Sequence, residues 1–345
     1  MPDSSLVSSR KDDHIRINLE KDVTSTISTG LEFVHLLPRA LPEIDLADVD
    51  VTTTILGKKV TAPILISSMT GGTEGAENIN RVLAEAAQAC GVAIGVGSQR
   101  AAIENPSLGK TFDVRSFAPD VVLFANLGAV QLNYGFGVDE CRRAIEMIGA
   151  DALYLHLNAI QEAVQPEGNT RFSGLLEKIE FVCRHLEVPV FIKEVGWGIS
   201  GEDAVRLAGT GIAGIDVAGA GGTSWSQVEM HRIEDPYRAH IAAAFHGWGI
   251  PTAHSIRMVR EAVPDLMVFA SGGLKDGVDA AKCIALGASL CGFASPLLKT
   301  AAVSTEATVR MINALQQEIR ISLFGCGKTS LDAFQGNPDV IQVED

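Results

Sequence analysis

The sequence predicts an α/β fold, a (β/α)8 TIM barrel with an N-terminal arm and an insertion after strand six. Two observations support this. Eight short segments are apolar on both faces, as in parallel strands covered on both sides, and segments with helical spacing lie between them. The predicted strands span 63–68, 92–97, 121–126, 152–157, 189–195, 213–218, 267–272 and 290–295. A doubly wound sheet is the alternative fold, but it accommodates eight equivalent strands in this order poorly.

The helical segments follow the strands in order. Residues 79–90 have helical spacing and end before Gly91, a residue type common just past helix C-termini. Further helices are predicted at 139–148, 174–186, 202–210, 255–263 and 276–287. The long interval between strands six and seven contains the predicted insertion, 224–250, which is polar and aromatic. Trp225 and Trp248 make it a candidate lid or subunit contact, although ordinary packing explains them equally well.

The chain outside the barrel is expected to form two smaller parts. Residues 1–62 form an N-terminal arm and cap segment, extended at first and then a short strand or loop layer with a β-like stretch at 49–60. The barrel spans 63–325, and residues 326–345 form a C-terminal tail.

Composition excludes several classes of protein. The 345 residues are 46% apolar and 20% charged, with a formal net charge of −14, which argues against binding to nucleic acid or to anionic membranes. No run of 18 apolar residues predicts a transmembrane helix, and the first residues lack the apolar core of a signal peptide. The six cysteines show no metal-ligand spacing, so buried thiols in a reducing cytoplasm are expected rather than zinc or disulfides.

Polar residues follow the first three predicted strands, where a barrel carries its chemistry. The first strand ends in the small residues and glycines of 67–72, which would let backbone N–H groups approach a ligand, although an ordinary glycine turn is as consistent. The second strand leads into Ser98 and Arg100. Arg100 could bind a phosphate or carboxylate, or form a surface salt bridge. The third strand presents Asn126.

Four polar side chains crowd the end of the fourth strand. His156 and Asn158 alternate along the chain, so we expect them to face the same side. Gln161 and Glu162 are adjacent, so we expect them to face differently and to have separate roles.

Lys193 interrupts the apolar fifth strand. A lysine inside a barrel is unfavourable unless it meets a negative group, so it is a Schiff-base lysine, a cation facing an anionic cofactor, or half of a structural ion pair. Glycine-rich turns after strands seven and eight, at 270–277 and 292–298, indicate a phosphate site. The Gly-Lys-Thr at 327–329 is not a P-loop, because Ser322 stands where that motif needs glycine.

Together these segments resemble one family. The stretches RKDDH, SSMTGG, GVGSQR, NLGA, LHLNAIQE, IKEVGWG, DVAGAGGTSW and ASGGL, between about Arg10 and Ser295, resemble type 2 isopentenyl-diphosphate isomerase. The resemblance implies a cytoplasmic homo-oligomer, a tetramer or octamer, that interconverts isopentenyl and dimethylallyl diphosphates in isoprenoid biosynthesis. It also implies FMN, Mg²⁺, and NADPH or NADH as the reductant of the flavin.

The resemblance assigns roles by position. FMN would contact Ser68, Met69, Thr70, Ser98, Asn126, Lys193 and Thr223, with its phosphate on Gly272, Gly273, Ala294 and Ser295. The substrate would contact Arg10, Lys11, His14, Ser98, Arg100, His156, Asn158 and Gln161. Gln161 and Lys193 would be catalytic, and Glu162 would bind Mg²⁺.

Three rival functions fit the residues less well. A flavin-dependent 2-hydroxy-acid oxidase needs a histidine base and an arginine after strand six, and 218–225 contains neither. An IMP dehydrogenase needs a nucleophilic cysteine in a barrel loop at a strand end, and none lies there. A flavin- or phosphate-binding barrel without catalysis would not need Glu162, a residue suited to metal binding, beside Gln161.

Overall fold

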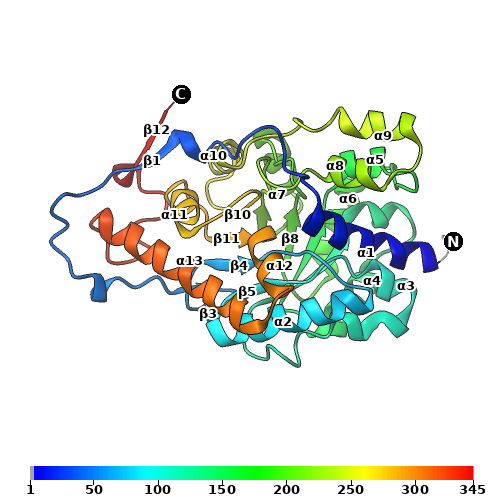
Figure 1. Ribbon diagram of the computed structural model, residues 1–345, viewed down its shortest axis with the longest axis horizontal. Coiled ribbons are helices and arrows are strands. Elements are labelled where there is room, and N and C mark those ends of the chain that lie inside the picture. Colours follow the sequence, from blue (N-terminus) through cyan, green and yellow to red (C-terminus); the bar gives the residue numbers. More distant parts are fainter. Residues whose placement is uncertain (1–3, 345) are drawn as a thin grey trace.

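The computed structural model describes residues 4–344, except the side chains of residues 4–10, 12 and 74. Eight parallel strands close into a barrel in the order β10-β11-β4-β5-β6-β7-β8-β9, so the predicted fold is confirmed and the doubly wound alternative is wrong (Figure 1). Each predicted strand segment supplies one barrel strand: β4 (Ile64–Ile66), β5 (Ala93–Gly95), β6 (Leu123–Gly128), β7 (Ala152–His156), β8 (Val190–Lys193), β9 (Gly214–Asp216), β10 (Met267–Ser271) and β11 (Leu290–Phe293).

Helices surround the barrel, and all six predicted ones are present. They are α2 (Glu74–Cys90), α4 (Val138–Ile148), α6 (Leu175–His185), α7 (Gly201–Ala208), α10 (Thr252–Ala262) and α11 (Gly277–Ala285). Gly91 ends α2 with a φ of 64°, as expected. Short helices not predicted from the sequence follow several strands: α3 (Arg100–Glu104), α5 (Ala159–Val164) and α12 (Ser295–Ala301). The long helix α13 (Thr305–Gly325) packs against α2 and α11.

Large aromatic side chains fill the barrel interior. Phe124 and Tyr154 are stacked with ring centroids 4.6 Å apart, and Phe191 and Phe269 are stacked at 5.1 Å. All four are fully buried, so the barrel is a packed core rather than a pore. A hairpin of β2 (Thr53–Ile55) and β3 (Lys58–Val60) packs its apolar side chains into the same cluster. The hairpin therefore closes the floor of the barrel, where the strands begin.

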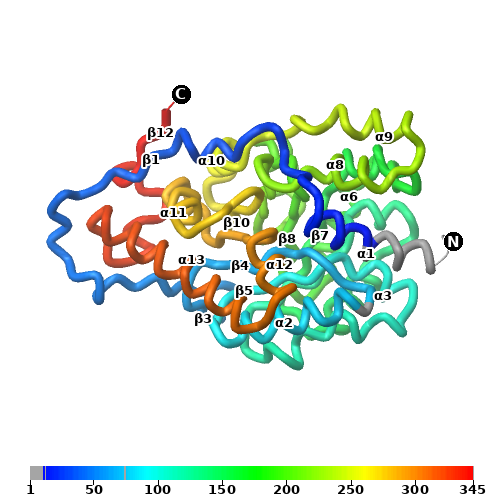
Figure 2. Tube along the Cα trace, viewed as in Figure 1, coloured from blue at the N-terminus to red at the C-terminus, as the bar shows by residue number. Residues whose placement is uncertain are grey.

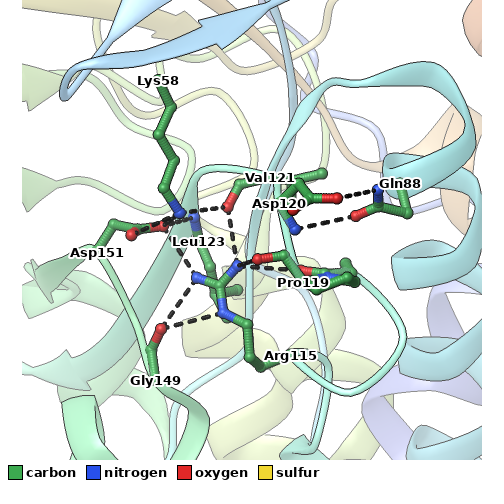
Figure 3. A network of polar contacts seen from close by, with 10 residues as sticks. Lys58, Gln88, Arg115, Pro119, Asp120, Val121, Leu123, Gly149 and Asp151 are labelled. Carbon is green, nitrogen blue, oxygen red and sulfur yellow. Dashed lines mark hydrogen bonds and ion pairs between the residues drawn. The ribbon is translucent and has the colours of Figure 1, made fainter.

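Polar contacts hold this floor together around Asp151 (Figure 3). The Asp151 carboxylate accepts hydrogen bonds from Lys58 Nζ, Arg115 Nη2 and Leu123 N, each at 2.9 Å. Arg115 also donates to the carbonyl oxygens of Gly149 and three other residues. These contacts tie the hairpin to the beginnings of β6 and β7.

The N-terminal arm is helical, so the expectation of an extended arm is wrong for residues 4–20. Helix α1 (Ser4–Glu20) lies against α8 (Trp225–Arg232), which with α9 (Pro236–Ala243) forms the insertion between β9 and β10 (Figure 1). Ile17 and Val23 bury their side chains with Val228 and the partly buried Trp225. A segment this polar is stabilised as a helix by docking rather than by intrinsic propensity.

A short strand from the N-terminal segment pairs with the last strand of the chain beside the barrel. Strand β1 (Val34–Leu36) pairs antiparallel with β12 (Ile341–Val343), as the trace in Figure 2 shows. The Gly-Lys-Thr at 327–329 lies after the end of α13 and not before a helix, in agreement with the exclusion of a P-loop. All six cysteines are free thiols, and only Cys183 is partly exposed. Within residues 4–344, no helix combines the length and apolar character needed to cross a bilayer.

Candidate functional site

A cavity of about 650 Å³ opens where the barrel strands end, at the mouth opposite the hairpin. Every predicted site residue except Arg10 lines it: Lys11, His14, Ser68, Met69, Thr70, Ser98, Arg100, Asn126, His156, Asn158, Gln161, Glu162, Lys193, Thr223, Gly272, Gly273, Ala294 and Ser295. The side chain of Arg10 lies outside the described residues. Residues from eight strand ends and from α1 thus converge on one volume, as barrel topology predicts.

Helix α1 brings cationic and aromatic groups over this cavity. Lys11 Nζ donates a hydrogen bond of 3.0 Å to the Ser98 carbonyl oxygen and lies 5.0 Å from the centroid of the Phe112 ring. One turn later, the His14 ring meets Trp225 of α8 edge-to-face, with centroids 5.1 Å apart. The arm is therefore part of the cavity wall.

A buried carboxylate that sequence reasoning missed, Glu229 of α8, joins the arm to the strand-four loop. Its Oε1 lies 3.0 Å from His14 Nε2 and accepts a hydrogen bond of 3.1 Å from Gln161 Nε2, while Oε2 accepts one of 2.8 Å from Arg232 Nε. Burial opposes ionisation, but the contacts with His14 and Arg232 outweigh it and lower the pKa of Glu229 to about 2. Glu229 therefore stays anionic and fixes the orientation of the Gln161 amide.

One amide, that of Asn158, organises the end of β7. Its Nδ2 donates to Gln161 Oε1 at 3.2 Å and to Glu162 Oε1 at 3.0 Å. The two adjacent residues therefore both turn toward the cavity, and the expectation that they face differently is wrong. Asn158 Oδ1 is buried and has no hydrogen-bond partner among the described residues, which leaves an acceptor at the cavity wall.

Glu162 is the carboxylate best placed for a cation in this part of the cavity. Its Oε1 accepts from Asn158, and its Oε2 accepts from the backbone N–H of Asn169. Across the described part of the chain, no cluster of three or more histidine, cysteine or acidic side chains could hold a metal. A divalent cation at Glu162 would therefore take most of its ligands from water or from a bound anion, the usual habit of Mg²⁺.

Arg100 forms a salt bridge, one of the two alternatives that its sequence position allowed, and it lies at the cavity. Its Nε donates to Glu104 Oε1 at 2.9 Å, and its Nη1 donates to Asn169 Oδ1 at 3.1 Å. The side chain forms a salt bridge and still lines the cavity.

Lys193 likewise has an ion-pair partner and a place in the cavity. Its Nζ lies 3.6 Å from Asp216 Oδ2 and donates to the Glu194 carbonyl oxygen at 2.9 Å. Asp216 is fully buried and accepts a hydrogen bond of 2.6 Å from Ser271 Oγ. Sequence reasoning missed Asp216, although it ends the strand next to β8 and is the residue paired with Lys193. Lys193 thus has a buried carboxylate as its partner beside the cavity, without an external anion.

His156 faces the cavity as a neutral imidazole. Asn126 donates through Nδ2 to the Val96 carbonyl oxygen, which turns its Oδ1 toward His156 Nδ1 at 2.8 Å. His156 Nδ1 therefore carries the proton, and Nε2 is left as an acceptor. Burial, aided by the charge of Lys193, lowers the pKa of His156 to about 4.

The opposite wall is a cradle of glycines and unpartnered hydroxyls. Gly272 and Gly273 have φ values of 104° and 78°, and a Cβ added to Gly272 would lie 2.1 Å from the Gly219 carbonyl oxygen. Backbone therefore packs directly on backbone here. At the end of β4, the buried hydroxyls of Ser68 and Thr70 lack partners within the described structure. The glycines are required by this packing, and the two hydroxyls are available to a ligand in the cavity.

The chain is similar in sequence to a family model and to several named proteins. A family model described as FMN-dependent dehydrogenase matches residues 155–342. Proteins called isopentenyl-diphosphate delta-isomerase from Synechocystis sp. and Nostoc sp. are 54% and 52% identical to the chain. The first match covers 93% of each protein, and the second covers 96% of this chain and 95% of the relative. The chain belongs to the isopentenyl-diphosphate delta-isomerase family.

The solved structures that the chain resembles share its fold. A mandelate oxidase with (S)-2-phenylpropionate is 20% identical, with a TM-score of 0.67 over 99% of this chain and 98% of the other. A flavocytochrome b2 mutant with pyruvate bound is 17% identical, with a TM-score of 0.69 over 99% of this chain and 88% of the other. The isopentenyl-diphosphate delta-isomerase family thus uses the same barrel for a different reaction, and the chain is an isomerase.

Proposed function

We propose that the chain interconverts isopentenyl and dimethylallyl diphosphates in the cavity described above, with FMN and Mg²⁺ bound and NADPH or NADH as the reductant of the flavin. One observation carries the proposal. The cavity of this family member holds the cations Lys11 and Arg100 beside Gln161 and Glu162, so charge for a diphosphate lies next to polar groups at the barrel mouth. The match to the FMN-dependent dehydrogenase family and the glycine cradle support FMN as the cofactor.

The reaction needs a proton added at one carbon and removed at another. An alkene is a weak base, and the tertiary cation formed by its protonation must be shielded from water. Reduced FMN, when bound, supplies a protic N5 and an electron-rich ring that can act as general acid and base without net oxidation. The chain's own contribution is to bind and orient the substrate, exclude water and balance charge.

Three side chains would orient the reacting end of the substrate. Lys193 supplies a positive charge beside the cradle, suited to an anionic ring. The amide of Gln161, fixed between Asn158 and Glu229, would contact the alkene end of the substrate. His156 is neutral near neutral pH, so its Nε2 would accept a hydrogen bond.

The diphosphate would lie toward α1. Lys11 and Arg100, together with Arg10, would neutralise its charge, and His14 would contact it. Glu162 would hold Mg²⁺ through one carboxylate, with phosphate oxygens completing the coordination. We also propose a cytoplasmic homo-oligomer, a tetramer or octamer, which size-exclusion chromatography with light scattering would test.

A spectrum of the purified protein followed by an assay tests the function. We expect yellow protein that bleaches with NADPH or NADH and then converts isopentenyl diphosphate in the presence of Mg²⁺, as followed by NMR.

Glu162→Gln should raise the Mg²⁺ concentration needed for half-maximal rate about tenfold or more, because a charged ligand is lost. Colourless protein that takes up no added FMN, or flavin that is reduced by mandelate or lactate, would contradict the proposal.

A further inference from the structure

We propose that Asn169, in the loop between α5 and α6, is a positioning residue that holds Arg100 and Glu162 apart and in place for a Mg²⁺-bound diphosphate. The inference rests on the proposed function. Asn169 is not itself a lining residue of the cavity. It lies behind two residues that are, and it contacts both of them.

The contacts of Asn169 connect three cavity residues. Its Oδ1 accepts hydrogen bonds from Arg100 Nη1 at 3.1 Å and from Gln131 Nε2 at 3.2 Å. Its backbone N–H donates to Glu162 Oε2. The side chain of Asn169 therefore acts only through its oxygen acceptor, and its backbone acts separately on the carboxylate.

This arrangement keeps opposite charges from pairing. Arg100 and Glu162 line the same cavity, yet the ion pairs found among the described residues join Arg100 only to Glu104. The side-chain oxygen of Asn169 satisfies part of the guanidinium, and its backbone N–H satisfies part of the carboxylate. Both partners are neutral, so the charges of Arg100 and Glu162 are left for a ligand. A direct Arg100–Glu162 pair would compete with both the phosphate and the metal.

The loop that carries Asn169 is anchored without help from its side chain. Asn133 Nδ2, at the end of η4 (Ala129–Asn133), donates to the carbonyl oxygens of Arg171 at 2.7 Å and Ser173 at 3.1 Å. Arg171 donates back to the Asn133 carbonyl oxygen at 2.9 Å, and its guanidinium lies 4.4 Å from the centroid of the Tyr134 ring. A change confined to the Asn169 side chain should therefore leave the loop backbone in place.

Two substitutions separate hydrogen bonding from shape. Asn169→Leu keeps a similar size and loses the acceptor, whereas Asn169→Gln keeps a neutral amide oxygen for Arg100. We expect Asn169→Leu to weaken the binding of inorganic pyrophosphate with Mg²⁺ about tenfold or more, and Asn169→Gln to stay within about threefold of the unchanged protein. FMN affinity should be the same in all three proteins, because Asn169 does not line the cavity.

The measurement is calorimetric titration of the FMN-loaded full chain with pyrophosphate in Mg²⁺ buffer. Asn133→Ala is the matched control. It removes two hydrogen bonds to the same loop but leaves the contacts of Arg171 with the Asn133 carbonyl oxygen and the Tyr134 ring. The loop therefore stays anchored, and we expect pyrophosphate affinity to stay within about threefold of the unchanged protein. The proposal is overturned if Asn169→Leu binds pyrophosphate normally, if Asn169→Gln loses as much affinity as Asn169→Leu, or if Asn133→Ala loses as much as Asn169→Leu.

Turnover distinguishes this inference from the proposed function. Asn169→Leu should raise KM for isopentenyl diphosphate while kcat changes little, because the reacting end of the substrate is untouched. Pyrophosphate binding needs no isomerisation. A full chain that binds pyrophosphate but does not isomerise would contradict the proposed function and leave the role of Asn169 measurable. Failure of the affinity pattern alone would contradict only the inference.

Discussion

At the scale of single residues, buried charges in the site come with their own partners. Lys193 has Asp216 beneath it, and Glu229 has His14, Gln161 and Arg232 around it. Each of these charged side chains has a partner within the chain itself. The site is therefore organised before substrate arrives, which lowers the ordering that binding must supply.

The Lys193–Asp216 pair allows stability and activity to be separated. Lys193→Met should destabilise the fold by about 3 kcal/mol, because it leaves the Asp216 charge buried and unpaired. Adding Asp216→Asn should restore most of that stability. Isomerisation should stay lost in both proteins, because the positive charge beside the cradle is gone. Urea unfolding and rate measurements on the two variants check this, and recovery of activity in the double variant would contradict a role for the lysine charge.

The lowered pKa of Glu229 predicts that the stability of the folded chain depends on pH. Its pKa is about 2 in the folded chain against an ordinary value of 4.5, so between these values the folded state binds fewer protons than the unfolded state. Stability contributed by Glu229 is therefore present above about pH 4.5 and falls as pH drops toward about 2. Over that range the loss is on the order of 3 kcal/mol.

Glu229→Gln should flatten this part of the stability curve. Urea midpoints measured from pH 6 down to pH 3.5 should converge for the two proteins as pH falls. Equal slopes at all pH values would show that the carboxyl is not held in its charged form.

At the scale of elements, the sequence predicted the strands and helices that have a regular pattern of apolar residues within their own segment. All eight strands and six helices follow from apolar runs and helical spacing. Helix α1 could not be predicted in this way, because its burial comes from Ile17 docking against α8, far along the chain. Glu229 was missed because its partners His14 and Gln161 are also far away in the sequence. Its spacing from Trp225, Val228 and Arg232, which puts all four on one helix face, could have indicated that it is buried.

Among the site residues, those at strand ends were predicted from the sequence, whereas the contacts between their side chains were not. The strand ends located the cavity, since topology brings them together whatever the loops do. The Asn158 amide donates hydrogen bonds to both Gln161 and Glu162. No rule of sequence spacing predicts that one side chain contacts both. Asp216 could have been found, because an acidic residue closing the strand beside a buried lysine is a natural partner.

Helix α1 predicts an effect of truncation on substrate binding. Removing residues 1–13 deletes Lys11 and should raise KM for isopentenyl diphosphate about tenfold or more, because a cation that would face the diphosphate is lost. Removing only residues 1–9 is the matched control and should leave KM near its starting value. Thermal unfolding should change little in either protein, since Ile17 keeps its contacts with α8. Equal KM values for both truncations would argue against a binding role for Arg10 and Lys11.

At the scale of the whole molecule, the barrel separates stability from chemistry. The Asp151 network (Figure 3) and the β2–β3 hairpin lie at the floor. The cavity lies at the mouth. Arg115→Ala should therefore destabilise the chain by about 3 kcal/mol, because several carbonyl oxygens and Asp151 lose a donor. KM and FMN affinity should not change. A shift in KM larger than about threefold at a temperature where the variant is folded would contradict this separation.

Closure of the barrel depends on β11 pairing with β4, and translation delivers these two strands last and first among the eight. Until the ribosome has released β11, the growing chain carries β4 with one hydrogen-bonding edge unsatisfied. Open edges of apolar strands recruit strands from other chains. The nascent chain therefore keeps two open strand edges, those of β4 and β10, until its eighth strand emerges and pairs with both.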